Sequence, residues 1–152
     1  MKTVAKDVYH IPLMPRNGIN CYIIEGVLID SGIRSSYKKI AKNVTDVPIH
    51  LHALTHAHAD HQGCSNEICS QFKVPLYCHE KEVARAESGL ATKDYPASQG
   101  MIAKFQQKHW AGKGQEVSKH LKKMITLKVL EYLKPQDMLM VISHFLEKKM
   151  VC

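Results

Sequence analysis

The sequence predicts an α/β domain with a mixed sheet and flanking helices, and three observations lead to this expectation. Short apolar segments bounded by Gly, Pro, Asn and Asp alternate with segments whose apolar residues have helical spacing. The 152 residues, 45% of them hydrophobic, are enough for one domain with a core. A His-rich stretch comes directly after an apolar segment and ends at Gly63, which is typical of the turn from a buried strand to a helix.

The first part of the chain is expected to contain three strands and one helix. Residues 8–11 and 21–28 have the composition of strands, and Asp30-Ser31-Gly32 forms the turn that ends the second strand. A helix is expected over residues 35–43, with Ser35 as its N-cap. Residues 49–54 form the strand that leads into the His-rich stretch.

The next part alternates helix and strand. We expect a helix over residues 62–72, a strand over 76–78, a short helix over 80–87 that ends at Ser88-Gly89, and a further helix over 98–110.

Aromatic residues in and before the last of these helices have two possible roles. Tyr95, Phe105 and Trp110 could line a substrate pocket. The alternative is that they pack the helix onto the body of the domain, as aromatic residues commonly do.

The His-rich stretch is the candidate metal site. His56, His58, Asp60 and His61 place three imidazoles and one carboxylate within six residues. In an extended segment alternate side chains point the same way, so the first three would converge, and His61 in the first helical turn could swing toward them. Imidazole and carboxylate favour Zn, Fe or Mn over Ca or Mg. The alternative is a solvated His-rich turn without a ligand.

Two further histidines, His50 and His52, lie on the preceding strand. They are expected to pack or to form hydrogen bonds within the sheet rather than to bind metal.

The order His-x-His-x-Asp-His after an apolar strand resembles the metallo-β-lactamase superfamily of metallohydrolases. The segments 18–24 and 27–32 are similar to the opening hairpin and Asp-x-Gly turn of that family, and 74–80 is similar to the strand after its motif helix. The resemblance extends from about residue 8 to 80 and more loosely to 121. It implies the N-terminal half of an αββα metallo-β-lactamase sandwich, because 152 residues are too few for both halves.

The resemblance also implies roles for individual residues. His56 and His58 would bind the first of two zinc ions, and Asp60 and His61 the second, with Asp60 also orienting the nucleophile. Asp30 would be a neighbouring residue that braces the His-rich loop. A third His for the first metal, a bridging Asp and a last His of the family have no recognisable counterpart here. His120 and His144 are not in a context that aims them at the motif, so this chain is expected to bind at most one ion, weakly.

The C-terminal part has two interpretations. Residues 1–123 would be a truncated metallo-β-lactamase-like domain, and residues 124–152 an out-of-frame tail. Reading the codons of residues 131–141 one base earlier permits Thr-Pro-Gly-His-x-x-Gly-His, which resembles the loop that carries the third His in the family. One base lost near Lys122-Lys123 would explain this. The alternative is an amphipathic C-terminal helix, because helical spacing is present at Val117, Leu121, Met124, Ile125 and Leu130.

The net charge, the apolar segments and the cysteine count indicate which partners and which cellular location to expect. The net charge of +7 is spread along the chain, and no aromatic residues interleave with a basic stripe, so nucleic acid is not the expected partner. No signal-like or membrane-spanning segment is visible, which predicts a cytoplasmic protein without membrane contact. The odd number of cysteines, five, favours reduced thiols, and Cys64 is expected to be buried.

The sequence therefore favours metal-assisted hydrolysis of a small-molecule substrate, which could be a thioester, lactone, β-lactam or phosphodiester. A persulfide-oxidising iron enzyme is possible within the same family. The alternative from another class is a non-catalytic remnant with a partial metal site, forming a homo-oligomer through exposed sheet surface.

Overall fold

The computed structural model describes residues 1–92, 95–96 and 100–121. Within these residues, seven strands form one mixed sheet in the order β1-β2-β3-β4-β5-β6-β7. The first four strands pair antiparallel, and β4 to β7 pair parallel. The strands are β1 (Lys2–Ala5), β2 (Val8–Pro12), β3 (Asn20–Ile24), β4 (Val27–Ile29), β5 (Leu51–Ala53), β6 (Leu76–His79) and β7 (Lys119–Leu121). The predicted α/β class with a mixed sheet is confirmed.

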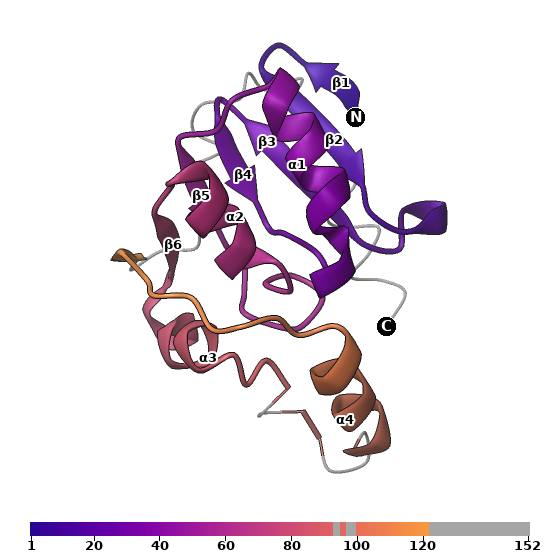
Figure 1. The fold of residues 1–152 in the computed structure, drawn as a ribbon, viewed down its shortest axis with the longest axis vertical. Helices are drawn as coiled ribbons and strands as arrows, with labels where there is room; N and C mark the ends of the chain where they lie inside the picture. The colour runs from indigo at the N-terminus through magenta and orange to yellow at the C-terminus, as the bar shows by residue number, and fades with distance from the viewer. Residues whose placement is uncertain (93–94, 97–99, 122–152) are drawn as a thin grey trace.

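The α-helices all come after β4 along the described chain. They are α1 (Tyr37–Asp46), α2 (Ser65–Phe72), α3 (Val83–Ser88) and α4 (Gly100–His109), and short 3-10 turns occupy Pro15–Asn17, Arg34–Ser36 and Glu80–Glu82. Figure 1 shows α1 and α2 lying over the same face of the sheet, with α3 and α4 beyond the end at which β4 and β5 finish. None of the described helices is long and apolar enough to cross a membrane.

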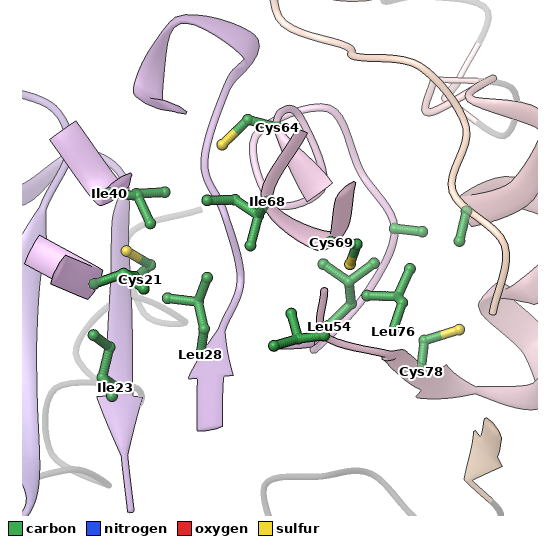
Figure 2. Close-up of a cluster of buried hydrophobic side chains, with 14 of the residues drawn as sticks. Cys21, Ile23, Leu28, Ile40, Leu54, Cys64, Ile68, Cys69, Leu76 and Cys78 are labelled. Atoms are coloured by element: carbon green, nitrogen blue, oxygen red, sulfur yellow. The ribbon is translucent and has the colours of Figure 1, made fainter. Parts of the chain in front are cut away.

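The main core lies between the sheet and these helices. Ile23 and Leu28 from the strands meet Ile40 from α1 and Ile68 from α2, and all four side chains are buried (Figure 2). The alternate residues of the same strands face the other way, where Val8, Ile24, Ile29 and Ala53 form a second buried cluster. The strands of this sheet therefore contribute apolar side chains to both faces, as the period of two requires.

Several predicted elements differ from the structure in their bounds. The single strand predicted over residues 21–28 is two strands, because Glu25 and Gly26 both have positive φ (49° and 78°) and form a tight turn. Ser35 lies within a 3-10 turn and is not the N-cap of α1; Ser36 occupies that position and makes no capping hydrogen bond through its side chain. The prediction that α3 ends at Ser88-Gly89 is confirmed, with Gly89 in the left-handed conformation (φ 68°).

Two strands at the edges of the sheet were not predicted. β1 pairs with β2, and β7 pairs with β6. The alternative of a C-terminal amphipathic helix is wrong for its first part, because Val117 is buried in the main core and Leu121 ends β7. The rest of that segment, with the predicted out-of-frame tail and His144, lies outside the described residues.

Candidate metal centre

The candidate residues lie where three parallel strands end. β4 ends at Ile29 and leads to Asp30, β5 ends at Ala53 and leads into the His-rich loop, and β6 ends at His79 and leads to Glu82. The carboxyl ends of parallel strands meet at one edge of a sheet, and ligands bind there in many open α/β sheets. The expected placement of the motif between a buried strand and a helix is therefore confirmed.

The loop is not arranged as a strand followed directly by a helix. α2 begins at Ser65, so His61 is not in its first turn as expected. Instead the amides of His61 and Gln62 both donate to the carbonyl of His58, at 3.0 Å each, and close a turn inside the motif. This turn, and not the helix, brings His61 back toward His56.

Asp30 connects the end of β4 to the His-rich loop. Its carboxylate accepts hydrogen bonds from the Thr55 amide (2.9 Å), the Thr55 hydroxyl (2.8 Å) and Nδ1 of His61 (2.8 Å). The predicted bracing role of Asp30 agrees with these contacts. Burial raises the pKa of Asp30, but the charge of His61 and the hydrogen bonds from His61 and Thr55 outweigh it, so the pKa is lowered.

The end of the motif is held by the turn that follows Asp30. The Ser31 amide and hydroxyl both donate to the His61 carbonyl (2.6 and 2.9 Å), and the Gly63 amide donates to the Gly32 carbonyl (2.7 Å). Ser31 in turn lies 3.0 Å from the Ser65 hydroxyl, which contacts Nε2 of the buried His52 at 2.9 Å. His52 thus has the hydrogen-bonding role in the sheet that was expected of it.

The three imidazoles of the motif lie together. The ring centroids of His56 and His58 are 4.6 Å apart, and those of His56 and His61 are 3.9 Å apart. Nε2 of His61 lies 3.5 Å from the Asp60 carboxylate. The structure therefore brings His56, His58 and His61 side by side, with Asp60 next to His61.

Hydrogen bonds engage the Nδ1 nitrogen of two of the three rings. Nδ1 of His61 is occupied by Asp30, and Nδ1 of His56 lies 3.1 Å from the Thr55 hydroxyl, which itself donates to Asp30. A ring that donates through Nδ1 presents Nε2 as a metal ligand, and such carboxylate-linked histidines are typical of zinc sites. Asp30 and Thr55 therefore orient both rings in a way that suits metal binding.

The protonation states of these groups differ. Burial and the charge of His61 lower the pKa of His56 to about 4, and burial together with Arg85 lowers the pKa of His58. Burial also acts to lower the pKa of His61, but Asp30 and Asp60 raise it to about 10. The pKa of Asp60 falls to about 2 because hydrogen bonding and charge from His61 outweigh burial. His56 and His58 are thus neutral near pH 7, as metal binding requires, whereas a metal at His61 must displace a proton.

The structure adds a residue that the sequence patterns do not reveal. Oε2 of Glu82 accepts a hydrogen bond from the Ala57 amide (2.8 Å), inside the His-rich loop, and forms an ion pair with Arg85 (2.5 Å). Burial raises the pKa of Glu82, but the Ala57 amide and Arg85 outweigh it, and the pKa is lowered. No local sequence signal marks this contact, because the partners are 25 residues apart.

The three aromatic candidates, Tyr95, Phe105 and Trp110, have different surroundings. Tyr95 contacts His58, with ring centroids 5.0 Å apart, so it lies beside the motif. Phe105 is 55% exposed, and its ring lies 6.4 Å from that of Trp110 and 4.8 Å from that of His109. Trp110 packs against a small alanine cluster, as the packing interpretation expects.

The remaining expectations concern single residues. His120 is exposed, and Cys64 is fully buried, as was expected of Cys64.

The donor chemistry of the motif fits a zinc-type ion, but the set is incomplete. Among residues 1–92, 95–96 and 100–121, no group of three or more His, Cys, Asp and Glu has the arrangement of a metal site. Zinc sites in proteins have three or four protein ligands. The described residues therefore offer oriented donors and need further ligands or water to complete a coordination sphere.

Comparison with known proteins identifies the family. The family model described as "Metallo-beta-lactamase superfamily" matches residues 14–133. A comparison with curated proteins gives no match.

Solved structures of metallo-β-lactamases have a similar fold. BJP-1, a subclass B3 metallo-beta-lactamase of Bradyrhizobium japonicum, superposes with a TM-score of 0.58 at 22% identity, covering 77% of this chain and 43% of that one. GOB-18 from Elizabethkingia meningoseptica gives 0.61 at 22% identity, covering 80% and 44%. The class B3 di-zinc enzyme LRA-12 from an Alaskan soil metagenome gives 0.61 at 20% identity, covering 78% and 44%.

The chain spans less than half the length of these structures, so the similarity concerns one part of their fold. At these identities the superpositions show the fold alone. The family model, in contrast, matches well over half of the 152 residues. The chain therefore belongs to the metallo-beta-lactamase superfamily.

Proposed function

We propose that the protein descends from a metal-dependent hydrolase and retains part of its metal centre. In an intact site His56 and His58 would hold one zinc-type ion, and Asp60 and His61 a second one. With only two protein ligands for each ion, this chain would hold at most one. The observation that carries this proposal is the orientation of the rings: Asp30 and Thr55 occupy Nδ1 of His61 and His56, so Nε2 is the nitrogen of each ring that can take a ligand role. In His61 a metal would replace the proton that Nε2 shares with Asp60. Zinc is the first choice, and Fe or Mn would suit the same donors.

The chemistry follows from this arrangement. A bound divalent ion would activate water at neutral pH and polarise a scissile carbonyl or phosphoryl group. Asp60, whose pKa is about 2, is ionised and can accept a hydrogen bond from a water molecule and orient it. The ionised Asp30 keeps His61 in a fixed orientation during this step.

The substrate class is proposed from the chemistry of the reaction. A small-molecule thioester, lactone, β-lactam or phosphodiester can each be cleaved by activated water, and the structures to which the chain is similar are named β-lactamases. Free thiols at Cys21, Cys64, Cys69 and Cys78 support a cytoplasmic location.

Activity measurements with matched variants test this proposal. The purified chain would be loaded with zinc and assayed against one member of each substrate class, beside His56→Ala and a control, His120→Ala, whose ring is exposed. We expect slow turnover of one class that His56→Ala abolishes and the control retains. Turnover that is equal in both variants would contradict the proposal.

A second candidate is a non-catalytic remnant that binds metal partially and self-associates. It is favoured by the incomplete donor set among the described residues and by the exposed side chains of Met101, Ile102 and Phe105 on α4. Metal content and size-exclusion chromatography separate the two candidates. Turnover that depends on bound metal supports the enzyme, and substoichiometric metal without turnover in an oligomer supports the remnant.

A further inference from the structure

We propose that Glu82 is a positioning residue that fixes the peptide between His56 and His58, and so sets the separation of these two rings. This inference rests on the proposed metal-binding function of the loop. The contact is the hydrogen bond of 2.8 Å from the Ala57 amide to Oε2 of Glu82. Ala57 is fully buried, so no water can replace Glu82 as the acceptor without rearrangement of the loop.

Because of its position, this contact affects the orientation of both proposed ligands, His56 and His58. The Ala57 amide belongs to the peptide that joins Ala57 to His56, and His58 follows directly. Rotation of this peptide would turn both rings, whose centroids are 4.6 Å apart. The loop is then held from two sides: Asp30, after β4, binds Thr55, and Glu82, after β6, binds Ala57. β5 lies between these two strands, so each neighbouring strand supplies one carboxylate.

Glu82 is itself held in place by Arg85. The two residues form an ion pair across one turn at the start of α3, with side chains 19% and 14% exposed. The same oxygen, Oε2, accepts from both Ala57 and Arg85, so the guanidinium fixes the atom that holds the loop. A carboxylate with a charged donor on one side and a backbone amide on the other is a short, well-oriented connection between β6 and the loop.

The experiment compares substitutions at Glu82 with a neighbouring control. Glu82→Ala removes the acceptor, Glu82→Asp keeps the charge but shortens the side chain by one methylene, and Glu82→Gln keeps an acceptor oxygen. Glu80→Ala is the control, since Glu80 lies on the same 3-10 turn and is exposed. Zinc affinity by isothermal titration, the visible spectrum of the cobalt-loaded chain and thermal unfolding would be measured for each.

We expect Glu82→Ala and Glu82→Asp to weaken zinc binding by about tenfold or more and to change the cobalt spectrum, as loss of outer partners of metal ligands does. Glu82→Gln should bind nearly as the parent does. Affinities and spectra of Glu82→Ala and Glu82→Asp that equal those of Glu80→Ala would overturn the inference, even if unfolding temperatures fall. If Glu82→Ala does not fold, Glu82→Asp decides between the two results.

Amide hydrogen exchange on the metal-free chain separates this inference from the proposed function. A slowly exchanging Ala57 amide that becomes fast in Glu82→Asp, and not in Glu80→Ala, supports the contact even if the parent binds no zinc, in which case the proposed function fails alone. Equal exchange of the Ala57 amide in parent and Glu82→Asp overturns the inference whatever the parent binds.

Discussion

At the scale of single residues, Asp30 is the side chain on which the candidate site depends most. It is only 5% exposed, has a positive φ of 58°, and accepts three hydrogen bonds from Thr55 and His61. A buried carboxylate with these partners keeps its charge, which explains why its pKa falls despite burial. Asn also tolerates this backbone conformation, so substitution with Asn isolates the loss of charge.

We predict that Asp30→Asn lowers the free energy of unfolding by about 2 kcal/mol, because His61 loses its ion pair and one acceptor becomes a donor. Asp7→Asn is the control, since Asp7 is exposed and also has a positive φ of 56°. Urea denaturation measures both. Because the pKa of Asp30 is lowered, its contribution exists above the unfolded value of 3.8 and is lost as the pH falls through the folded value. An Asp30→Asn variant as stable as Asp7→Asn at pH 7 would contradict this account.

The buried cysteines give a second prediction at this scale. Burial raises the pKa of Cys64 and Cys69 to about 12 and that of Cys78 to about 11, from 9.0 in the unfolded chain. As the pH rises above 9.0, the unfolded chain loses these protons before the folded chain does, so the folded state loses stability. In a Cys152→Ser background we expect very slow reaction with iodoacetamide at pH 8 and falling unfolding temperatures above pH 9. Rapid labelling of Cys64 in the folded chain would contradict the prediction.

At the scale of elements, close backbone contacts hold the His-rich loop against the turn after β4. A Cβ on Gly63 would lie 2.5 Å from the backbone of Ile33 and Arg34, so a side chain there forces the two segments apart. Gly100, at the start of α4, offers a contrast, because a Cβ on this residue would have no neighbouring atom of the described residues within 4 Å.

We predict that Gly63→Ala lowers the free energy of unfolding by about 2 kcal/mol, as overpacking against fixed backbone does, and that Gly100→Ala is neutral or slightly stabilising. Chemical denaturation of both variants measures the difference. If Gly63→Ala matched Gly100→Ala, the close packing of the loop on the turn after β4 would be wrong.

The strands and helices also show how much of the fold can be predicted from the sequence. The strands β2, β5 and β6 and the helices α1 to α4 could be predicted, because apolar spacing and Gly or Pro residues mark them locally. β1 and β7 could not, because an edge strand of three or four residues with little burial has no apolar pattern of its own and depends on its neighbour.

Part of the candidate site can likewise be predicted from the sequence, and part cannot. The four donors of the motif are close together in sequence and visible as a pattern. Glu82 is brought to Ala57 only when β5 and β6 pair, and the turn at His61 depends on hydrogen bonds to the carbonyl of His58. The contact of Glu82 arises from the pairing of strands and is not encoded in any short segment.

At the scale of the whole molecule, the chain spans less than half the length of the structures to which it is similar. We propose that residues 1–123 form the metallo-β-lactamase-like part and that residues 124–152 are read out of frame. Sequencing the locus tests this directly: insertion of one base near the codons of Lys122-Lys123 should open a longer frame that encodes Thr-Pro-Gly-His. A stop codon soon after the insertion would refute the frame hypothesis.

The central claim is that the His-rich loop retains an oriented but incomplete metal centre. Isothermal titration of the metal-free chain with zinc tests it most directly, with His58→Ala as the variant that removes one donor. We predict at most one ion per chain, bound weakly and lost in the variant, because His56, His58, Asp60 and His61 offer each of two ions only two ligands. Two tight sites in the parent chain, or no binding at all, would contradict the account.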